Sequence, residues 1–296
     1  MQDVKPTYDT IVIGGGIVGA SAAYHLARAG AKTLLVDSRD AGRASDAGAG
    51  IIAPETGGTG IDPAWFAFAI PAGEYYPTLI AQLAEEQAGD TGFRVCGELM
   101  VAAEEDELEA YEAKKHIIFE RQRTRGLPST DDLREITAEE AKVLFPALKT
   151  VLKALYFRGT ARVDGRLLSK ALLNAALKRD ISIQNGRADE LIIEGGRVKG
   201  VRIQGSAVEA GNVIIAGGAW SAAFGEQLKC VIPVEPQRGQ IIHLHLAGAD
   251  TGNWAVVTAF HGHYLVCWDE GRVVAGATRE TGAGFVPQTS AAGVHE

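Results

Sequence analysis

Three glycines near the N-terminus have the spacing of a phosphate-binding turn. Gly14, Gly16 and Gly19 form the pattern GxGxxG inside the run IVIGGGIVGASAAYHLARAGAKTLLVD. In such a turn the first glycine permits a tight bend, the second lets backbone N–H groups approach a pyrophosphate, and the third lets a helix pack closely on its strand. Asp37 follows about 20 residues later, where a carboxylate can accept a hydrogen bond from a ribose hydroxyl. These residues predict binding of a dinucleotide, and the acid at position 37 disfavours a ribose 2′-phosphate.

The sequence also predicts the elements that must hold this turn. Residues 8–13 form a short apolar strand, residues 17–29 form an amphipathic helix that Gly30 ends, and residues 32–36 form a second strand. This order places the positive end of the helix dipole against the phosphates. We therefore expect a βαβ nucleotide-binding unit rather than an ordinary tight turn.

Other residues that could do chemistry give weaker signals. The pairs His243/His245 and His261/His263 would each share one face of a strand, but no cysteine or acidic pair accompanies them at metal-ligand spacing. We expect no metal site. The three cysteines are far apart and form no CxxC motif, which argues against a disulfide framework. No GxSxG motif is present to predict a hydrolase.

Composition excludes further classes of function. The net charge is −8, and no cluster of Lys and Arg is present to contact phosphates, so we expect no nucleic-acid partner. The N-terminal run MQDVKPTYDT lacks the apolar core of a signal peptide. A cytoplasmic protein is therefore expected, and peripheral contact with the inner face of a membrane is left open.

The segment after the first βαβ unit has an unusual composition. Residues 40–60 are too apolar for a disordered linker and too rich in glycine for a helix, so we expect a loop wrapped closely on a ligand. Asp62 and Pro63 then begin a helix. Pro71 and Pro77 are expected to divide the helical material that follows.

The middle of the chain shows one strand pattern and three helix starts. Residues 93–101 alternate as in a half-buried strand, and the acidic residues 104–109 indicate a solvated helix start. Thr137 and Glu140 form a capping box, and Asp164 caps a further helix. The apolar stripe of that last helix is Leu168, Leu172, Ala175 and Ala176.

The second half of the chain is rich in predicted strands. Gly195 and Gly196 indicate a hairpin, and residues 212–216 form an apolar strand that runs into a glycine pair. Further strands are expected at residues 240–246, 256–260, 264–268 and 272–277. The order predicts an α/β protein whose Rossmann-like parallel domain is interrupted by a mostly antiparallel α+β substrate domain. We assign residues 1–78 and 150–224 to the first domain, and residues 79–149 and 225–296 to the second.

Four runs of sequence together resemble one flavoprotein family, that of D-amino-acid oxidase, glycine oxidase and the D-amino-acid dehydrogenases. The opening run resembles its FAD signature, and GRASDAGAGIIAP resembles the second cofactor segment, which passes under the flavin. YFRGTARVDGRLLSKALLNAAL resembles the return into the FAD domain, and VIIAGGAWS resembles the strand end that closes it. The resemblance implies that FAD is the cofactor. Non-covalent binding is expected, because the second cofactor segment contains no Cys or His.

The resemblance also implies the roles of individual residues. Ala44 and Ser45 would meet phosphate or ribityl oxygens, and Ala49, Gly50 and Ile51 would lie near the isoalloxazine. The full set of implied FAD contacts is Gly14, Gly16, Val18, Gly19, Asp37, Ser38, Ala44, Ser45, Ala49, Gly50, Ile51, Ala188, Gly217 and Gly218. The family more often has Glu at the position of Asp37, and either carboxylate can accept the ribose hydroxyl.

Two residues are implied on the substrate side. Tyr264 aligns with a tyrosine that lies over the flavin and contacts the substrate carboxylate, and Arg279 follows a strand at a place where side chains approach the substrate. The alternatives are a sheet tyrosine with a satisfied hydroxyl and a solvated turn arginine. Beyond Thr278 the family continues into a GxRP-type segment and a GH-type glycine loop, and neither occurs in this sequence. We therefore expect this 296-residue chain alone to oxidise amino acids poorly.

The implied reaction is oxidation of the CH–NH group of glycine or of a small D-amino acid to the imine, with hydride transfer to flavin N5. The electrons would then pass to O2 or to a respiratory partner. Three alternatives stay open: a related flavoprotein acting on a hydroxy acid or glycerol phosphate, a nicotinamide enzyme, and a non-catalytic FAD-binding fragment. In the last case a second subunit or a second copy would complete the fold.

Overall fold

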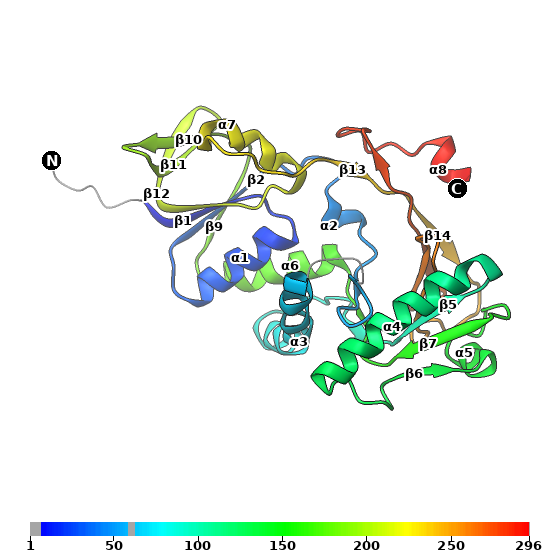
Figure 1. Ribbon diagram of the computed structural model, residues 1–296. Coiled ribbons are helices and arrows are strands. Elements are labelled where there is room, and N and C mark those ends of the chain that lie inside the picture. The colour runs from blue at the N-terminus through cyan, green and yellow to red at the C-terminus, as the bar shows by residue number, and fades with distance from the viewer. Residues whose placement is uncertain (1–6, 59–62, 296) are drawn as a thin grey trace.

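The computed structural model describes residues 7–58 and 63–295, and it contains two large β-sheets in two lobes (Figure 1). One sheet has six strands in the order β10-β11-β12-β1-β2-β9, and the other has seven in the order β14-β17-β16-β15-β5-β7-β6. Parallel and antiparallel pairing both occur, so the predicted α/β class with a Rossmann-like part is confirmed. The proposed domain boundaries stay a prediction.

The six-stranded sheet contains the predicted βαβ unit. Strand β1 pairs in parallel with β2 and with β12, and β2 pairs in parallel with β9. Strands β10, β11 and β12 form an antiparallel meander. The elements are β1 (Tyr8–Ile13), α1 (Ile17–Arg28), β2 (Thr33–Asp37), β9 (Ser182–Asn185), β10 (Ala188–Glu194), β11 (Arg197–Ile203) and β12 (Ser206–Ile215). The first strand is found as predicted, and α1 ends two residues before Gly30, which adopts a positive φ of 79°.

Apolar side chains cover both faces of this sheet, which makes the lobe three layers deep (Figure 1). On one face, helices α1 and α6 (Gly165–Leu177) pack on strand residues such as Val12 and Leu35. On the other face, Leu191 and Val201 of the meander pack on Ile11. The strands of the parallel part are therefore buried on both sides, as their continuous apolar runs require.

The seven-stranded sheet is antiparallel except where β5 and β15 pair in parallel. Its strands are β5 (Glu98–Ala102), β6 (Leu133–Ile136), β7 (Lys153–Phe157), β14 (Ile241–His245), β15 (Val256–Thr258), β16 (Tyr264–Cys267) and β17 (Arg272–Gly276). Helix α4 (Leu108–Arg125) packs on the face that bears Met100, and α5 (Ala138–Leu144) packs on the face that bears Leu99. The predicted half-buried strand at 93–101 is therefore wrong in burial, since all five residues of β5 are buried.

Local glycine geometry explains why that predicted strand is also divided. Gly97 adopts a positive φ of 76° and separates β4 (Arg94–Val95) from β5. Strand β4 joins a three-stranded sheet with β8 (Ala161–Arg162) and β3 (Ile51–Ile52). The alternating pattern of the predicted strand extends across this bend, and Gly97 is the one residue in the run whose type indicates it.

Two predictions for residues 40–86 are wrong. The expected loop contains a short helix, α2 (Ala44–Ala47), whose turn is supported by an ion pair of 2.9 Å between Arg43 and Asp46. Helix α3 (Pro63–Glu86) runs through both Pro71 and Pro77. Each proline removes one backbone donor, but packing of α3 against the core offsets this loss. Asp62, the expected helix cap, lies outside the described residues.

The predicted helix caps are present. Thr137 and Glu140 form both hydrogen bonds of a capping box, and Asp164 accepts from two N–H groups of α6. The acidic start at 104–109 is solvated except at Glu107, which is 4% exposed. The remaining elements are η1 (Glu105–Glu107), η2 (Gly218–Phe224), α7 (Gly225–Leu228), β13 (Gln237–Arg238), β18 (Glu280–Thr281) and α8 (Ala291–His295).

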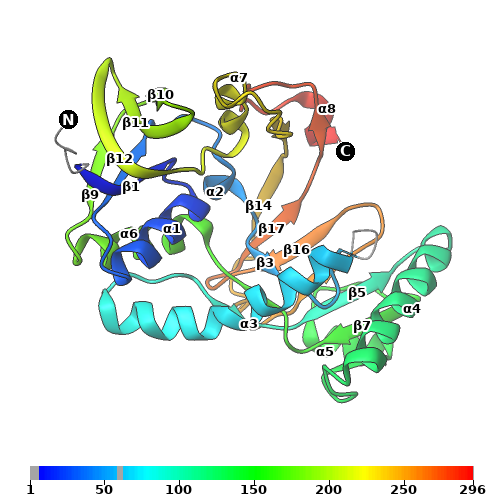
Figure 2. The ribbon, with the colours of Figure 1, turned by 60° about the vertical axis from the view of Figure 1, so that its left-hand side comes forward.

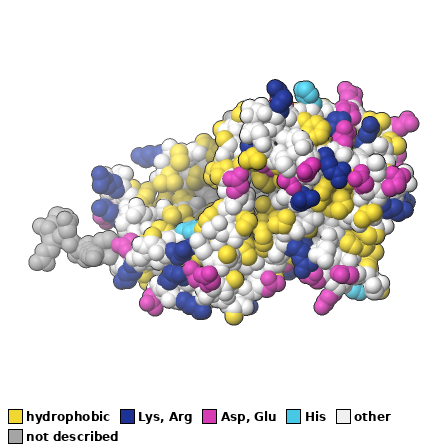
Figure 3. Space-filling view, turned by 90° about the horizontal axis from the view of Figure 1, so that it is seen from below, with side chains coloured by type: hydrophobic (Ala, Val, Ile, Leu, Met, Phe, Trp, Pro, Cys, Tyr) yellow, Lys and Arg dark blue, Asp and Glu magenta, His cyan; other side chains and the backbone are white. Residues whose placement is uncertain are grey.

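The surface carries charges of both signs. On the face seen in Figure 3, Lys and Arg side chains lie among Asp and Glu, with hydrophobic side chains between them. Within residues 7–58 and 63–295, no helix has the length and apolar character that crossing a membrane requires.

Candidate cofactor and substrate site

Two of the predicted glycines are required by the packing of the βαβ unit itself. Gly14 adopts a positive φ of 103°, and a Cβ there would overlap the carbonyl oxygen of Ala216 at the end of β12. A Cβ on Gly19 would overlap the carbonyl oxygen of Gly14 and lie 2.9 Å from its carbonyl carbon. Both positions therefore exclude a side chain, whether or not a ligand is bound.

Gly16 differs from these two because the protein leaves room beside it. A Cβ on Gly16 would meet only the hydroxyl of Ser45, at 3.1 Å. That hydroxyl accepts a hydrogen bond of 2.8 Å from the N–H of Ile17, in the first turn of α1. The next residue, Val18, is 67% exposed. The N-terminus of α1 is thus open on the side that Ser45 borders, which is the geometry of an anion site at a helix N-terminus.

Asp37 lies against the same turn. Its carboxylate ends β2, and a Cβ on Gly15 would come within 2.8 Å of Oδ2. Arg43 pairs with this oxygen at 2.8 Å. The pKa of the Arg43 guanidinium is raised, mainly by its hydrogen bonds to Asp46 and to a smaller extent by the nearby charge of Asp37. Ser38 is exposed and donates to Asp40 at 2.5 Å.

Residues distant in sequence complete this edge of the sheet. A Cβ on Gly14 would lie 3.0 Å from the Cα of Gly217, so the ends of β1 and β12 meet there. Gly218 follows at the start of η2. Ala188 is buried at the start of β10, two residues after Gly186, whose N–H donates to the carbonyl of Asp37. The structure brings these predicted residues to the carboxyl ends of the parallel strands, where nucleotides bind in such folds.

The second predicted segment runs between the two lobes (Figure 2). Gly50 adopts a positive φ of 76°, and its carbonyl accepts from the N–H of Val163 at 2.9 Å. A Cβ on Gly50 would overlap Val163. Ala49 and Ile51 pack against an apolar cluster of the seven-stranded sheet. Ala44, at the start of α2, is exposed. This segment therefore connects the edge of the parallel sheet with the face of the other sheet.

A pocket adjoins this segment. It lies between α2, the N-terminus of α6 and strands β14 and β17. Its lining includes Ser45, Ala49, Asp164, His243, Trp268 and Arg272. Together, the open helix N-terminus, the carboxylate of Asp37 and this path between the lobes fit an extended dinucleotide such as FAD. No three His, Cys, Asp or Glu side chains group as metal ligands among the residues that the structure describes.

The two residues predicted on the substrate side lie at neighbouring strands, Tyr264 at the start of β16 and Arg279 just after the end of β17. Tyr264 pairs with Gly276 across β16 and β17, and a Cβ on Gly276 would lie 2.7 Å from the Tyr264 ring carbon Cζ. Burial raises the pKa of Tyr264, and the positive charge of Arg279 partly opposes this. Arg279 is exposed, and no hydrogen bond or ion pair joins it to another residue of the described chain. Tyr264 packs on the same cluster as Ile51. A tyrosine and an unpaired cation thus lie near one end of the face that the second segment contacts.

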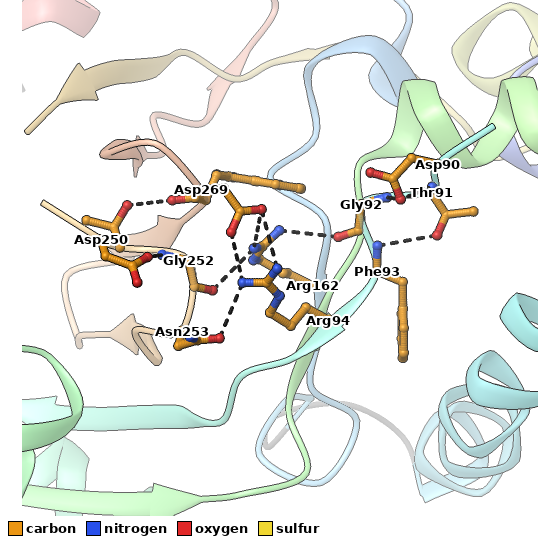
Figure 4. A network of polar contacts seen from close by, with 12 residues as sticks. Asp90, Thr91, Gly92, Phe93, Arg94, Arg162, Asp250, Gly252, Asn253 and Asp269 are labelled. Atoms are coloured by element: carbon orange, nitrogen blue, oxygen red, sulfur yellow. Dashed lines mark hydrogen bonds and ion pairs between the residues drawn. The ribbon is translucent and has the colours of Figure 1, made fainter.

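One buried cation was not predicted. Arg162 is 2% exposed, and its guanidinium lies 4.2 Å from the ring centre of Trp268, which Arg272 also contacts at 4.3 Å. It donates to the carbonyls of Gly92 and Gly252, each at 3.3 Å (Figure 4). Its Nε and the Trp268 Nε1 are buried without partners among the described residues. A single arginine in the run GTARVDG gave no signal of this burial.

An ion pair between Arg94 and Asp269 lies beside the buried Arg162 (Figure 4). Arg94 pairs with Asp269 at 2.9 Å and donates to Asn253 at 3.3 Å. The same Asp269 lies 3.9 Å from Arg162. These contacts fix the strand that leads into β5 against the turns that flank β15 and β16.

Comparison with known proteins extends these observations over the chain. Residues 9–296 match the family model described as DAO, FAD dependent oxidoreductase. The chain is 36% identical to the uncharacterized oxidoreductase YurR of Bacillus subtilis (strain 168), over 97% of this chain and 75% of the relative. It is 30% identical to a glycine oxidase of Pseudomonas aeruginosa, over 91% of this chain and 71% of the relative. The crystal structure of iminodiacetate oxidase from Chelativorans sp. BNC1 matches with a TM-score of 0.87 and 37% identity, over 97% of this chain and 76% of that one.

Proposed function

Because this chain belongs to the DAO family of FAD dependent oxidoreductases, we propose that it oxidises the amine carbon of a small amino acid. FAD is the cofactor, and the chain is an oxidoreductase. The proposed substrate class is glycine, N-substituted glycines and small D-amino acids. Similarity to an iminodiacetate oxidase and to a glycine oxidase supports an amine that carries at least one carboxylate.

The observation that carries the proposal is the position of Tyr264 on the apolar cluster that the second cofactor segment contacts, with Arg279 three residues after Gly276, the cross-strand partner of Tyr264. Arg279 is exposed and has no carboxylate partner in the described chain, and it follows the end of β17, the strand that pairs with Tyr264. An unpaired guanidinium and a phenol hydroxyl can together bind a carboxylate through charge-assisted hydrogen bonds. Tyr264 belongs to the apolar cluster that Ala49 and Ile51 contact, so this pair borders the region to which we assign the flavin ring.

The proposed amine oxidation requires no acid or base side chain of the protein. FAD, when bound, supplies the two-electron acceptor that takes a hydride from the α-carbon. The nitrogen loses one proton to solvent, and the resulting imine hydrolyses to an oxo acid and to ammonia, or to an amine when the substrate is N-substituted. The chain would orient the α-carbon through Tyr264 and Arg279, and the apolar cluster around Ile51 would exclude water.

A substrate panel tests the proposal. Flavin bleaching without oxygen should be fast with glycine, iminodiacetate or D-alanine and absent with glycerol 3-phosphate and lactate. Reoxidation by O2, compared with reoxidation by an artificial quinone, identifies the electron acceptor. Arg279→Gln should raise KM for the amino acids about tenfold or more, because a hydrogen bond to a charged group contributes about 1.5 kcal/mol or more.

A matched control separates this effect from loss of surface charge. Arg197→Gln removes an exposed arginine from the β10–β11 hairpin of the other sheet, and KM should not change. Bleaching by glycerol 3-phosphate or lactate alone would replace the amine proposal with the hydroxy-compound alternative. An unchanged KM in Arg279→Gln would remove this residue from the substrate site.

A further inference from the structure

A buried carboxylate lies where the seven-stranded sheet meets the segment after β3, and three threonine hydroxyls surround it. Glu98 is 2% exposed at the start of β5. Its Oε2 accepts from Thr56 at 2.5 Å and from Thr160 at 3.0 Å, and its Oε1 accepts from Thr258 at 2.8 Å. Thr56 and Thr160 are themselves 1% and 0% exposed, so the group is closed to solvent.

The three hydroxyls come from three separate parts of the chain. Thr56 follows the second cofactor segment, four residues after the end of β3. Thr160 lies between β7 and β8, and β8 pairs with β3 at Ile51. Thr258 is the last residue of β15. One carboxylate therefore joins both sides of the β3–β8 pair to the seven-stranded sheet.

The position of Thr258 connects Glu98 with the substrate side. Thr258 is the cross-strand partner of Tyr264, which in turn pairs with Gly276. Directly paired residues point to the same face of a sheet, so Thr258 lies beside the Tyr264 ring. Glu98 pairs with Val256, whose side chain belongs to the cluster that Ala49 and Ile51 contact. Glu98 thus lies on the face of the sheet that meets the second cofactor segment.

The carboxylate depends on these three donors. No Lys, Arg or His forms an ion pair with Glu98 in the described chain. A buried carboxylate without a counter-charge is unfavourable unless hydrogen bonds replace its water. All three hydroxyls must therefore stay within reach of one side chain, which constrains the spacing of the three segments. An apolar side chain at position 98 would fill the space without imposing this spacing.

We propose that Glu98 is a positioning residue of the cofactor site, which fixes the segment containing Ala49 to Thr56 against the strand end that bears Tyr264. It acts through Thr56 on the segment assigned to the flavin and through Thr258 on the tyrosine assigned to the substrate. The inference rests on the proposed function only in those two assignments.

The test measures FAD affinity, which needs no turnover. Thr56→Val and Thr258→Val each remove one hydroxyl and keep the side-chain shape. Each should raise the Kd for FAD about tenfold, measured by quenching of flavin fluorescence as apoprotein is titrated. The double variant should be little weaker than either single one, because both hydroxyls act through the same carboxylate. Thr258→Ser keeps the hydroxyl that Thr258→Val removes, so its Kd for FAD should equal that of the parent.

A control variant isolates the loss of a buried hydroxyl as such. Thr33 in β2 is 1% exposed and donates to the carbonyl of Ala31 at 3.0 Å, away from the second segment. Thr33→Val should lower the unfolding temperature and leave the Kd for FAD unchanged. If Thr56→Val and Thr258→Val behave like this control, with Kd within twofold of the parent, Glu98 is only a polar part of the core and the proposal is wrong. Failure to oxidise any amine would overturn the proposed function without altering this readout.

Discussion

Substitutions at Gly19 and Gly16 should affect different properties, the stability of the apoprotein and the binding of FAD, although both glycines belong to one motif. Gly19→Ala places a methyl group over the carbonyl of Gly14, 2.9 Å from its carbon, where ordinary contacts begin at 3.4 Å. Helix α1 must therefore move away from β1. Gly16→Val meets only the Ser45 hydroxyl, at 3.1 Å, and Gly16 has a φ of −67° that any residue adopts. Its side chain would occupy the open N-terminus of α1, where we place the pyrophosphate.

The magnitudes follow from these contacts. Overpacking of this kind costs about 1–3 kcal/mol or more, and the better helix propensity of alanine returns about 1 kcal/mol. Because the overlap is with backbone atoms, the upper end of this range applies, and the apoprotein of Gly19→Ala should lose about 2 kcal/mol, which is about 4–8 °C in Tm at about 2–4 °C per kcal/mol. Gly16→Val loses a favourable cap residue, about 1 kcal/mol. Its main effect should be on FAD, because a side chain there prevents close approach of the phosphates.

Thermal unfolding with and without FAD separates the two effects. FAD at 100 times its Kd should stabilise the parent by about 2.7 kcal/mol, which raises its Tm by several degrees. Gly16→Val should show an apoprotein Tm about 2–4 °C below that of the parent, and no rise with FAD. Gly19→Ala should show a lowered apoprotein Tm. A normal FAD-dependent rise in Gly16→Val would refute the assignment of this turn to the phosphates, and an unchanged Tm in Gly19→Ala would refute the packing argument.

Four further results are expected. Acid precipitation should leave the yellow colour in the supernatant, because the second cofactor segment has no Cys or His to bond the flavin; colour in the pellet would contradict this. Asp37→Asn should raise the Kd for FAD about tenfold to a hundredfold, since hydrogen bonds to charged groups contribute about 1.5–3 kcal/mol, and fluorescence titration measures it. Tyr264→Phe should raise KM for glycine by a factor that is constant below pH 10 in steady-state assays, because burial raises the pKa of Tyr264 above its ordinary value of 10.0. Burial would raise the pKa of Glu107, but hydrogen bonds from the N–H groups of Ala103, Glu104 and Phe260 outweigh it and lower the pKa below the ordinary value of 4.5. The ionised Glu107 therefore stabilises the fold above that pH, and this stabilisation is lost as the pH falls. In thermal unfolding, the Tm deficit of Glu107→Gln should shrink below about pH 4.

Sequence analysis correctly predicted the parts of the site whose residues lie close together in the chain. The turn from Gly14 to Gly19 and the end of β2 at Asp37 belong to one continuous unit, so spacing alone located them. The contact between Ser45 and Ile17 joins residues 28 positions apart; the family resemblance placed Ser45 at phosphate or ribityl oxygens but did not indicate this contact. Glu98 and Arg162 gave no signal, because the partners that surround each of them come from segments distant in sequence. The prolines of α3 misled for the same reason, since tertiary packing outweighed a local preference.

The seven-stranded sheet consists of two sets of strands that are widely separated in the sequence and are therefore synthesised at different times. Strands β5, β7 and β6 come from residues 98–157, and the other four come from residues 241–276. They meet where β5 pairs with β15, and the Thr258–Glu98 hydrogen bond across this seam joins residues 160 positions apart. During synthesis, β5 therefore remains an edge strand with unpaired backbone groups until more than 250 residues exist. Closing so long a loop is entropically unfavourable, and contacts of such high sequence separation form slowly. The seam should consequently be among the last parts of the molecule to gain protection from hydrogen exchange during refolding.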